Sequence, residues 1–178
     1  FFDSLSYVFL TYCSYTTALF ILSPLATRGL DLIALETRTI RHSWAAMVLG
    51  AFLQTFLDII IDPIALQGNR WFLGQIYGYY EAGLHFGVPI SNYAGWLLTS
   101  FALVAAFQWV DRRHEQKTPR GIVAMPYRSL LGPVLYLSVL IFNWAVTFWI
   151  GENLIALTGI LIFTLPIVMV VVLALERI

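Results

Sequence analysis

Five long apolar stretches dominate this chain, near residues 5–25, 43–61, 92–110, 129–150 and 154–175. Each is close to the roughly 20 residues that an α-helix needs to cross the hydrocarbon core of a bilayer. Hydrophobic residues make up 60% of the sequence and charged residues 11%, whereas soluble domains carry about 25% charged residues. We therefore predict an all-α fold, a polytopic transmembrane helical bundle of about five spans that forms a single membrane domain over residues 1–178.

Two of the connections have patterns of their own. Residues 27–42 place Leu30, Ile33 and Ile40 at helical spacing against charged side chains, a pattern that predicts an amphipathic helix lying in the membrane interface. Residues 63–90 carry five glycines among aromatic residues and are too broken for a plain span. We expect this segment to be a structured, partly re-entrant loop, because non-helical backbone is tolerated there only under cover of protein or water.

The cationic residues indicate an orientation. With five spans, nine of the ten Lys and Arg residues fall on one face and only Arg70 falls on the other. By the positive-inside rule, the face with nine cations is predicted to be cytoplasmic, in a multi-pass protein of the cell (inner) membrane. The zero net charge implies no nucleic acid as a partner. The chain starts at Phe1 rather than at a methionine, which suggests a trimmed product.

Asp58 and Asp62 lie at the end of the second apolar stretch, and Pro63 follows. An Asp in the middle of a span costs about 2.5 to 3.5 kcal/mol, so such residues are functional candidates by default. Four residues apart on a helix, the two carboxyl groups share one face, and burial and like-charge repulsion favour retention of one proton. The alternatives are structural: Asp62 caps a helix that starts at Pro63, and Asp58 pairs with Arg70 or with an amide.

The glycine-rich loop is also rich in aromatic residues, among them Trp71, Tyr77, Tyr80 and, at the start of the next span, Trp96. Aromatic faces stabilise a nearby cation, and glycines let the backbone approach a flat ligand. This composition suits a slot for a polyene, and it equally suits an ordinary interfacial belt of aromatic residues.

Polar residues of the same loop give further candidates. Glu81 and His85 stand four residues apart, as in a metal-ligand pair or a proton relay, or as partners in a local hydrogen bond. Asn92 is placed to orient a water molecule or to cap the third span. Three scattered histidines exclude a multi-histidine di-iron centre, and no G-x-G-x-x-G or P-loop is present. We expect no metal and no cofactor.

The pattern D-x-x-x-D-P at Asp58 to Pro63, followed by Gly68, Trp71, the Tyr77 to Tyr80 cluster and G-V-P-I-S-N-Y-A-G-W from Gly87 to Trp96, resembles a known family. It is similar to the carotenoid biosynthesis membrane proteins that include carotenoid 1,2-hydratases and bisanhydrobacterioruberin hydratase. The resemblance covers about residues 43–113.

The resemblance implies an enzyme of the hydro-lyase type that adds water to the terminal 1,2 double bond of an acyclic carotenoid without a cofactor. Asp58 or Asp62 would then donate the proton, and Asn92 or the partner carboxylate would position the water. Tyr77, Tyr80 and Trp71 would face the tertiary cation. Its partners would be a carotenoid and lipid.

A competing hypothesis is non-catalytic. The same fold suits a pigment-binding or scaffold subunit of a larger, photosynthetic membrane complex, with His85 or His42 as a pigment ligand. A small transporter is less favoured, because charges within the spans are few and no repeated half is visible.

Overall fold

The computed structural model describes residues 2–29, 31–71, 74, 77–114 and 126–176, and in them the predicted helical membrane bundle is confirmed. Six helices, two short strands and one 3₁₀ turn follow in the order α1 (Phe2–Leu22), β1 (Leu25–Arg28), β2 (Asp31–Ala34), α2 (Arg38–Arg41), α3 (Trp44–Ala65), η1 (Gly68–Arg70), α4 (Ile90–His114), α5 (Arg128–Trp149) and α6 (Asn153–Leu175). Among the described residues, α3, α4, α5 and residues 153–172 of α6 are long and apolar enough to span a membrane, and residues 6–22 of α1 form a shorter apolar helix.

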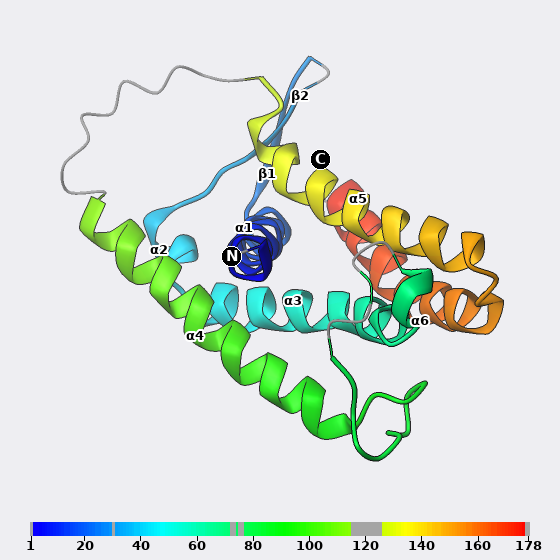
Figure 1. Cartoon of the computed structure of the whole chain (residues 1–178). Helices are drawn as coiled ribbons and strands as arrows, with labels where there is room; N and C mark the ends of the chain where they lie inside the picture. The colour runs from blue at the N-terminus through cyan, green and yellow to red at the C-terminus, as the bar shows by residue number, and fades with distance from the viewer. Residues whose placement is uncertain (1, 30, 72–73, 75–76, 115–125, 177–178) are drawn as a thin grey trace.

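The helices pack around α3. Figure 1 shows α3 running between α4 on one side and α5 with α6 on the other, while α1 is seen nearly end-on beside it. The main core joins α3, α5 and α6 through buried apolar side chains, including Leu57, Ile60, Leu140 and Phe163. A second cluster joins α1, α3 and α4 around Leu19 and Val104. This arrangement buries α3 more than any other span, so polar groups on α3 lie inside the protein.

The amphipathic helix predicted over residues 27–42 is wrong for most of its length. The segment forms an antiparallel pair of strands, with Leu25 opposite Ala34 and Arg28 opposite Asp31. Gly29 takes a positive φ of 64° at the turn, a conformation that costs glycine little and other residues much. Helical spacing in the sequence was therefore overridden by a local turn, and only the four-residue α2 remains helical.

Hydrogen bonds from α5 explain why the strand pair is favoured. The backbone N–H of Ala34 donates to Ser129 Oγ at 3.0 Å, and the N–H of Tyr127 donates to Asp31 Oδ1 at 3.1 Å. These bonds satisfy polar groups at the edge of β2 and at the start of α5, and they involve residues about 95 positions apart. The residues of one helix-length segment contain no information about hydrogen-bond partners so far away along the chain.

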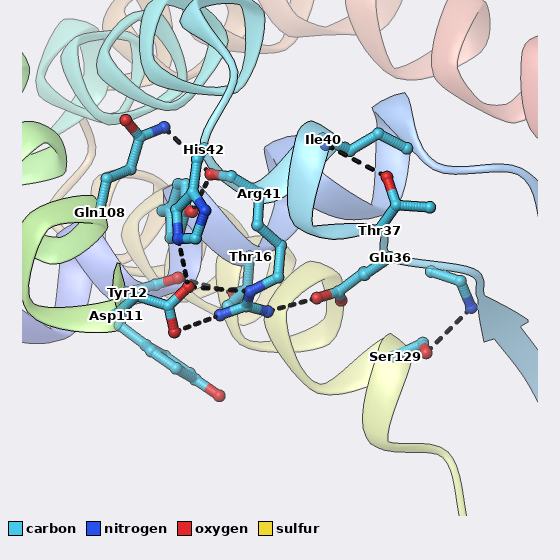
Figure 2. Close-up of polar contacts among 12 residues, drawn as sticks. Tyr12, Thr16, Glu36, Thr37, Ile40, Arg41, His42, Gln108, Asp111 and Ser129 are labelled. Atoms are coloured by element: carbon cyan, nitrogen blue, oxygen red, sulfur yellow. Dashed lines mark hydrogen bonds and ion pairs between the residues drawn. The ribbon is translucent and has the colours of Figure 1, made fainter. Parts of the chain in front are cut away.

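A charged cluster fixes α2 and the start of α3 to the end of α4. The Arg41 guanidinium donates to Asp111 through Nε and Nη2, both at 3.0 Å, and Nη1 lies 2.5 Å from Glu36. His42 Nε2 lies 3.1 Å from Asp111. Figure 2 shows Arg41 held between the two carboxylates, with Gln108 of α4 reaching the same segment. This bidentate geometry is the strongest form of an arginine–carboxylate pair, so it anchors the end of the bundle opposite Asp58 and Asp62.

Close contact between α1 and α5 makes one glycine a test of the packing. A Cβ added at Gly132 would lie 2.2 Å from Thr16 Oγ1 and 2.7 Å from Thr16 Cβ. We expect Gly132→Ala to destabilise the bundle by about 1 to 3 kcal/mol, the usual range for overpacking. The measurement is thermal unfolding in detergent. Gly95→Ala in α4 is the matched control, because nothing lies within 4 Å of its Cβ position, and it should not lower the melting temperature.

Candidate functional site

Asp58 and Asp62 both lie on the buried face of α3, where they are 5% and 3% exposed. The helix does not end at Asp62 but continues through Pro63 to Ala65, so the capping explanation for Asp62 is wrong. Arg70 does not pair with Asp58, since its Nη1 lies 2.6 Å from Glu152 Oε1 at the turn between α5 and α6. Two structural explanations are therefore excluded: Asp62 does not cap a helix, and Asp58 does not pair with Arg70.

Three donors converge on Asp62. The Tyr77 hydroxyl donates to Oδ1 at 2.6 Å, and the Asn92 amide donates to Oδ2. The Trp96 indole also lies near this carboxyl group and favours its ionised form, and its ring packs on Tyr7 of α1 with centroids 4.7 Å apart. Asn92 and Trp96 are one turn apart at the start of α4, so both reach the same carboxyl group. These donors favour the ionised form of the Asp62 carboxyl group, against the burial that disfavours it.

Asp58 has a different environment, although it is only one turn away. Its Oδ2 is buried and has no hydrogen-bond partner among the described residues. Its neighbours Leu57 and Ile60 on α3 are both buried apolar residues, and no cation among the described residues pairs with it. A buried charge without a partner is costly, so this position accommodates a neutral carboxyl group far better than an ionised one.

The charge of the carboxyl pair reaches the tyrosines of the loop. The pKa of Tyr77 is raised, first by burial and then by its hydrogen bond to Asp62 and the charge of that group. The pKa of Tyr79 is raised first by burial and then by the negative potential of Asp62. Both phenols therefore stay protonated at neutral pH, and Tyr77 acts as a hydrogen-bond donor.

The other residues predicted for substrate binding are divided between the core and the surface. Trp71 is 6% exposed and belongs to the main apolar core. Tyr80 is fully exposed and Glu81 is exposed, so the structure does not bring these two side chains to the carboxyl pair. Tyr77, Asn92 and Trp96 are brought to it.

Glu81 and His85 do not lie on one face of a helix. His85 starts a tight turn in which Phe86 and Gly87 both have positive φ, 49° and 91°, as two-residue hairpin turns of type I′ require. His85 Nδ1 lies 2.6 Å from the Tyr93 hydroxyl, and burial lowers the pKa of His85, so the neutral ring accepts this hydrogen bond. The described residues contain no group of three or more His, Cys, Asp or Glu side chains suited to a metal ion.

Sequence reasoning missed two polar residues near Asp58. Gln54 precedes Asp58 by four residues and is 1% exposed, and this spacing was a usable signal. Tyr136 of α5 is 5% exposed and lies within range of the Asp58 charge. The sequence does not indicate that residues 136 and 58 lie near each other, because α4 separates their two helices along the chain.

A comparison with known protein families identifies a relationship over most of the chain. The family described as "Carotenoid biosynthesis protein" matches residues 4–166, a wider region than residues 43–113. No curated protein and no solved structure matches the chain.

Proposed function

The chain belongs to the carotenoid biosynthesis protein family, and we propose that this multi-pass membrane protein is a hydratase of that pathway. In this proposal it adds water to the terminal 1,2 double bond of an acyclic carotenoid and forms a tertiary alcohol. The addition is redox-neutral, so it uses neither an electron carrier nor a nucleotide. The arginine distribution supports insertion in the cytoplasmic membrane with the Arg41 and Asp111 end inside the cell.

The observation that carries the proposal is the contrast between two adjacent carboxyl groups. Asp62 accepts hydrogen bonds from Tyr77 and Asn92, whereas Asp58 Oδ2 is buried and has no partner among the described residues. Pairs of carboxyl groups whose environments differ in this way divide acid and anion roles between them. In this proposal Asp58 is the protonated member and the acid, and Asp62 is the anion beside it.

Each step of the reaction then has a group to perform it. Asp58 transfers its proton to the less substituted alkene carbon, and the positive charge develops on the neighbouring tertiary carbon. The Asp62 carboxylate stabilises this cation electrostatically, and the rings of Tyr77 and Trp96 lie beside the carboxylate. A water oxygen bonds to the tertiary carbon and gives up one proton to the Asp58 carboxylate, so the acid is restored.

Expression of the chain in a bacterial host that makes lycopene tests this function. We expect a new, more polar carotenoid whose mass is that of lycopene plus one water, or plus two where both ends react. Chromatography with mass spectrometry identifies the tertiary alcohol. Lycopene that stays unchanged while it co-purifies with the protein would instead support a pigment-binding subunit, the competing role.

A further inference from the structure

Two polar atoms on one face of α3 have no hydrogen-bond partner in the part of the chain that the structure describes. Gln54 is 1% exposed and its Nε2 has no hydrogen-bond partner among the described residues, and the same holds for Oδ2 of Asp58, which is 5% exposed. One atom is a donor and the other an acceptor. An unmade buried hydrogen bond costs about 1 to 3 kcal/mol for each group, so two such atoms on one face call for a ligand.

The two groups are spaced for a small bridging ligand. Residues 54 and 58 are one helical turn apart, which places their Cβ atoms about 5 to 6 Å from each other. They form no direct hydrogen bond, since both atoms are unpartnered. A third polar group approaches from α5, where the Tyr136 hydroxyl donates to the carbonyl of Leu53 at 2.7 Å. Its proton is used in that bond, so its oxygen remains free to accept.

We propose that Gln54, Asp58 and Tyr136 bind one water molecule between α3 and α5, and that this is the water that adds to the substrate. The site has the two to four polar partners that a buried water requires. Gln54 is accordingly a positioning residue for the nucleophile. This inference rests on the proposed hydratase function and replaces Asn92, which is engaged with Asp62, as the group that orients the water.

The donor and acceptor count fits the chemistry. The Gln54 amide donates to one lone pair of the water, and the two water protons face Asp58 Oδ2 and Tyr136 Oη. One lone pair is left to form the bond to the tertiary carbon. After Asp58 has given its own proton to the alkene, its carboxylate receives a proton from the same water, so one hydrogen and one hydroxyl group have been added and no charge remains.

A hydrogen bond from α1 sets the orientation of the Gln54 amide. The Thr11 hydroxyl lies 2.7 Å from the carbonyl of Tyr7 and 3.0 Å from Gln54 Oε1, so its one proton is shared between these two acceptors. Because Oε1 faces Thr11, Nε2 points away from Thr11. Thr11→Val should therefore weaken the water site without altering Gln54 itself.

The decisive experiment measures what happens to the cation when the water is misplaced. In D₂O, Asp58 delivers a deuteron to the alkene, and a cation that is not captured by water loses a proton and returns as deuterated alkene. We expect Gln54→Leu to lower hydration about 100-fold, the scale of effect that misplacing a reactant has, while deuterium exchange into recovered substrate continues. The ratio of exchange to hydration should rise at least 10-fold, and Thr11→Val should raise it less.

Gln108→Leu is the matched control, because this buried amide donates to the carbonyls of Arg41 and Ser43 at the opposite end of the bundle. It should leave the ratio unchanged. An unchanged ratio in Gln54→Leu would overturn the water assignment while leaving the hydratase function intact. If the wild-type protein catalysed neither exchange nor hydration, the proposed hydratase function itself would be refuted.

X-ray hydroxyl-radical footprinting detects the water independently of activity, because radicals formed from a bound water oxidise the adjacent side chain. Tyr136 and Tyr15 are both 5% exposed, but the Tyr15 hydroxyl lies 2.5 Å from the carbonyl of Arg41 at the far end. In wild type we expect Tyr136 to be labelled several-fold more than Tyr15. In Gln54→Leu we expect the two tyrosines to be labelled equally. Equal labelling of the two tyrosines in wild type would refute the site whatever the activity.

Discussion

Replacing Asp58 by asparagine should abolish hydration of lycopene and leave the protein folded. General acid catalysis contributes about 10²- to 10⁴-fold in typical enzymes, and protonation of an unactivated alkene places the requirement at the upper end of that range. Asparagine matches the shape of a neutral carboxyl group but has no proton acidic enough to transfer. The measurement is the yield of tertiary alcohol in the lycopene-producing host, normalised to the amount of protein in the membrane.

The result is specific only if the variant is as stable as wild type. An asparagine at position 58 keeps the size of the neutral acid and an oxygen that can accept, and no protein group among the described residues bonds to Asp58 Oδ2, so thermal unfolding should change little. Asp31→Asn is the matched control: Asp31 lies in β2 and accepts the N–H of Tyr127 at 3.1 Å, a bond that the asparagine oxygen can keep. Alcohol formed by Asp58→Asn at the wild-type level would end the assignment of Asp58 as the acid.

The bundle could be predicted from sequence because each span carries its own evidence. A helix that crosses a bilayer satisfies its backbone internally, so the length and apolarity of α3 or α5 are sufficient. The strand pair after α1 was missed for the opposite reason. Its stability depends on a positive φ at Gly29 and on Ser129 and Tyr127, which only the folded chain brings together.

The same distinction applies to the site. Asp58, Asp62, Asn92 and Trp96 were predicted because an acidic residue in an apolar stretch, or a polar residue at its edge, stands out locally. Tyr80 was grouped with Tyr77 by composition, yet one side chain is fully exposed and the other bonds to Asp62, since neighbouring loop residues point in different directions. Which of two similar carboxyl groups is hydrogen-bonded depends on long-range contacts, and so only the structure distinguishes their environments.

Replacing Asp62 by asparagine tests the anion and should lower hydration about 100-fold or more, the scale seen when one preorganised electrostatic group is removed from an active site. The substitution removes the negative charge next to the developing cation. It also places an amide N–H₂ where Asp62 now accepts from Tyr77 or Asn92, so the new donor either faces the Asn92 amide donor or makes the Tyr77 hydroxyl turn and accept. The alcohol yield and the melting temperature should both fall, unlike the outcome for Asp58→Asn.

A second substitution separates the loss of charge from the loss of packing. In the double variant Asp62→Asn with Asn92→Asp, the carboxylate moves from α3 to its present amide partner on α4, and the pair keeps one acceptor and one donor. Because the charge returns within a side-chain length of its original position, we expect the double variant to recover at least 10-fold over Asp62→Asn alone, a coupling of about 1.4 kcal/mol. Asn92→Asp by itself should be impaired, because two carboxylates would then face each other. Equal yields from the double variant and from Asp62→Asn would show that Asp62 acts by fixing α4 and the loop, and that the cation is stabilised elsewhere.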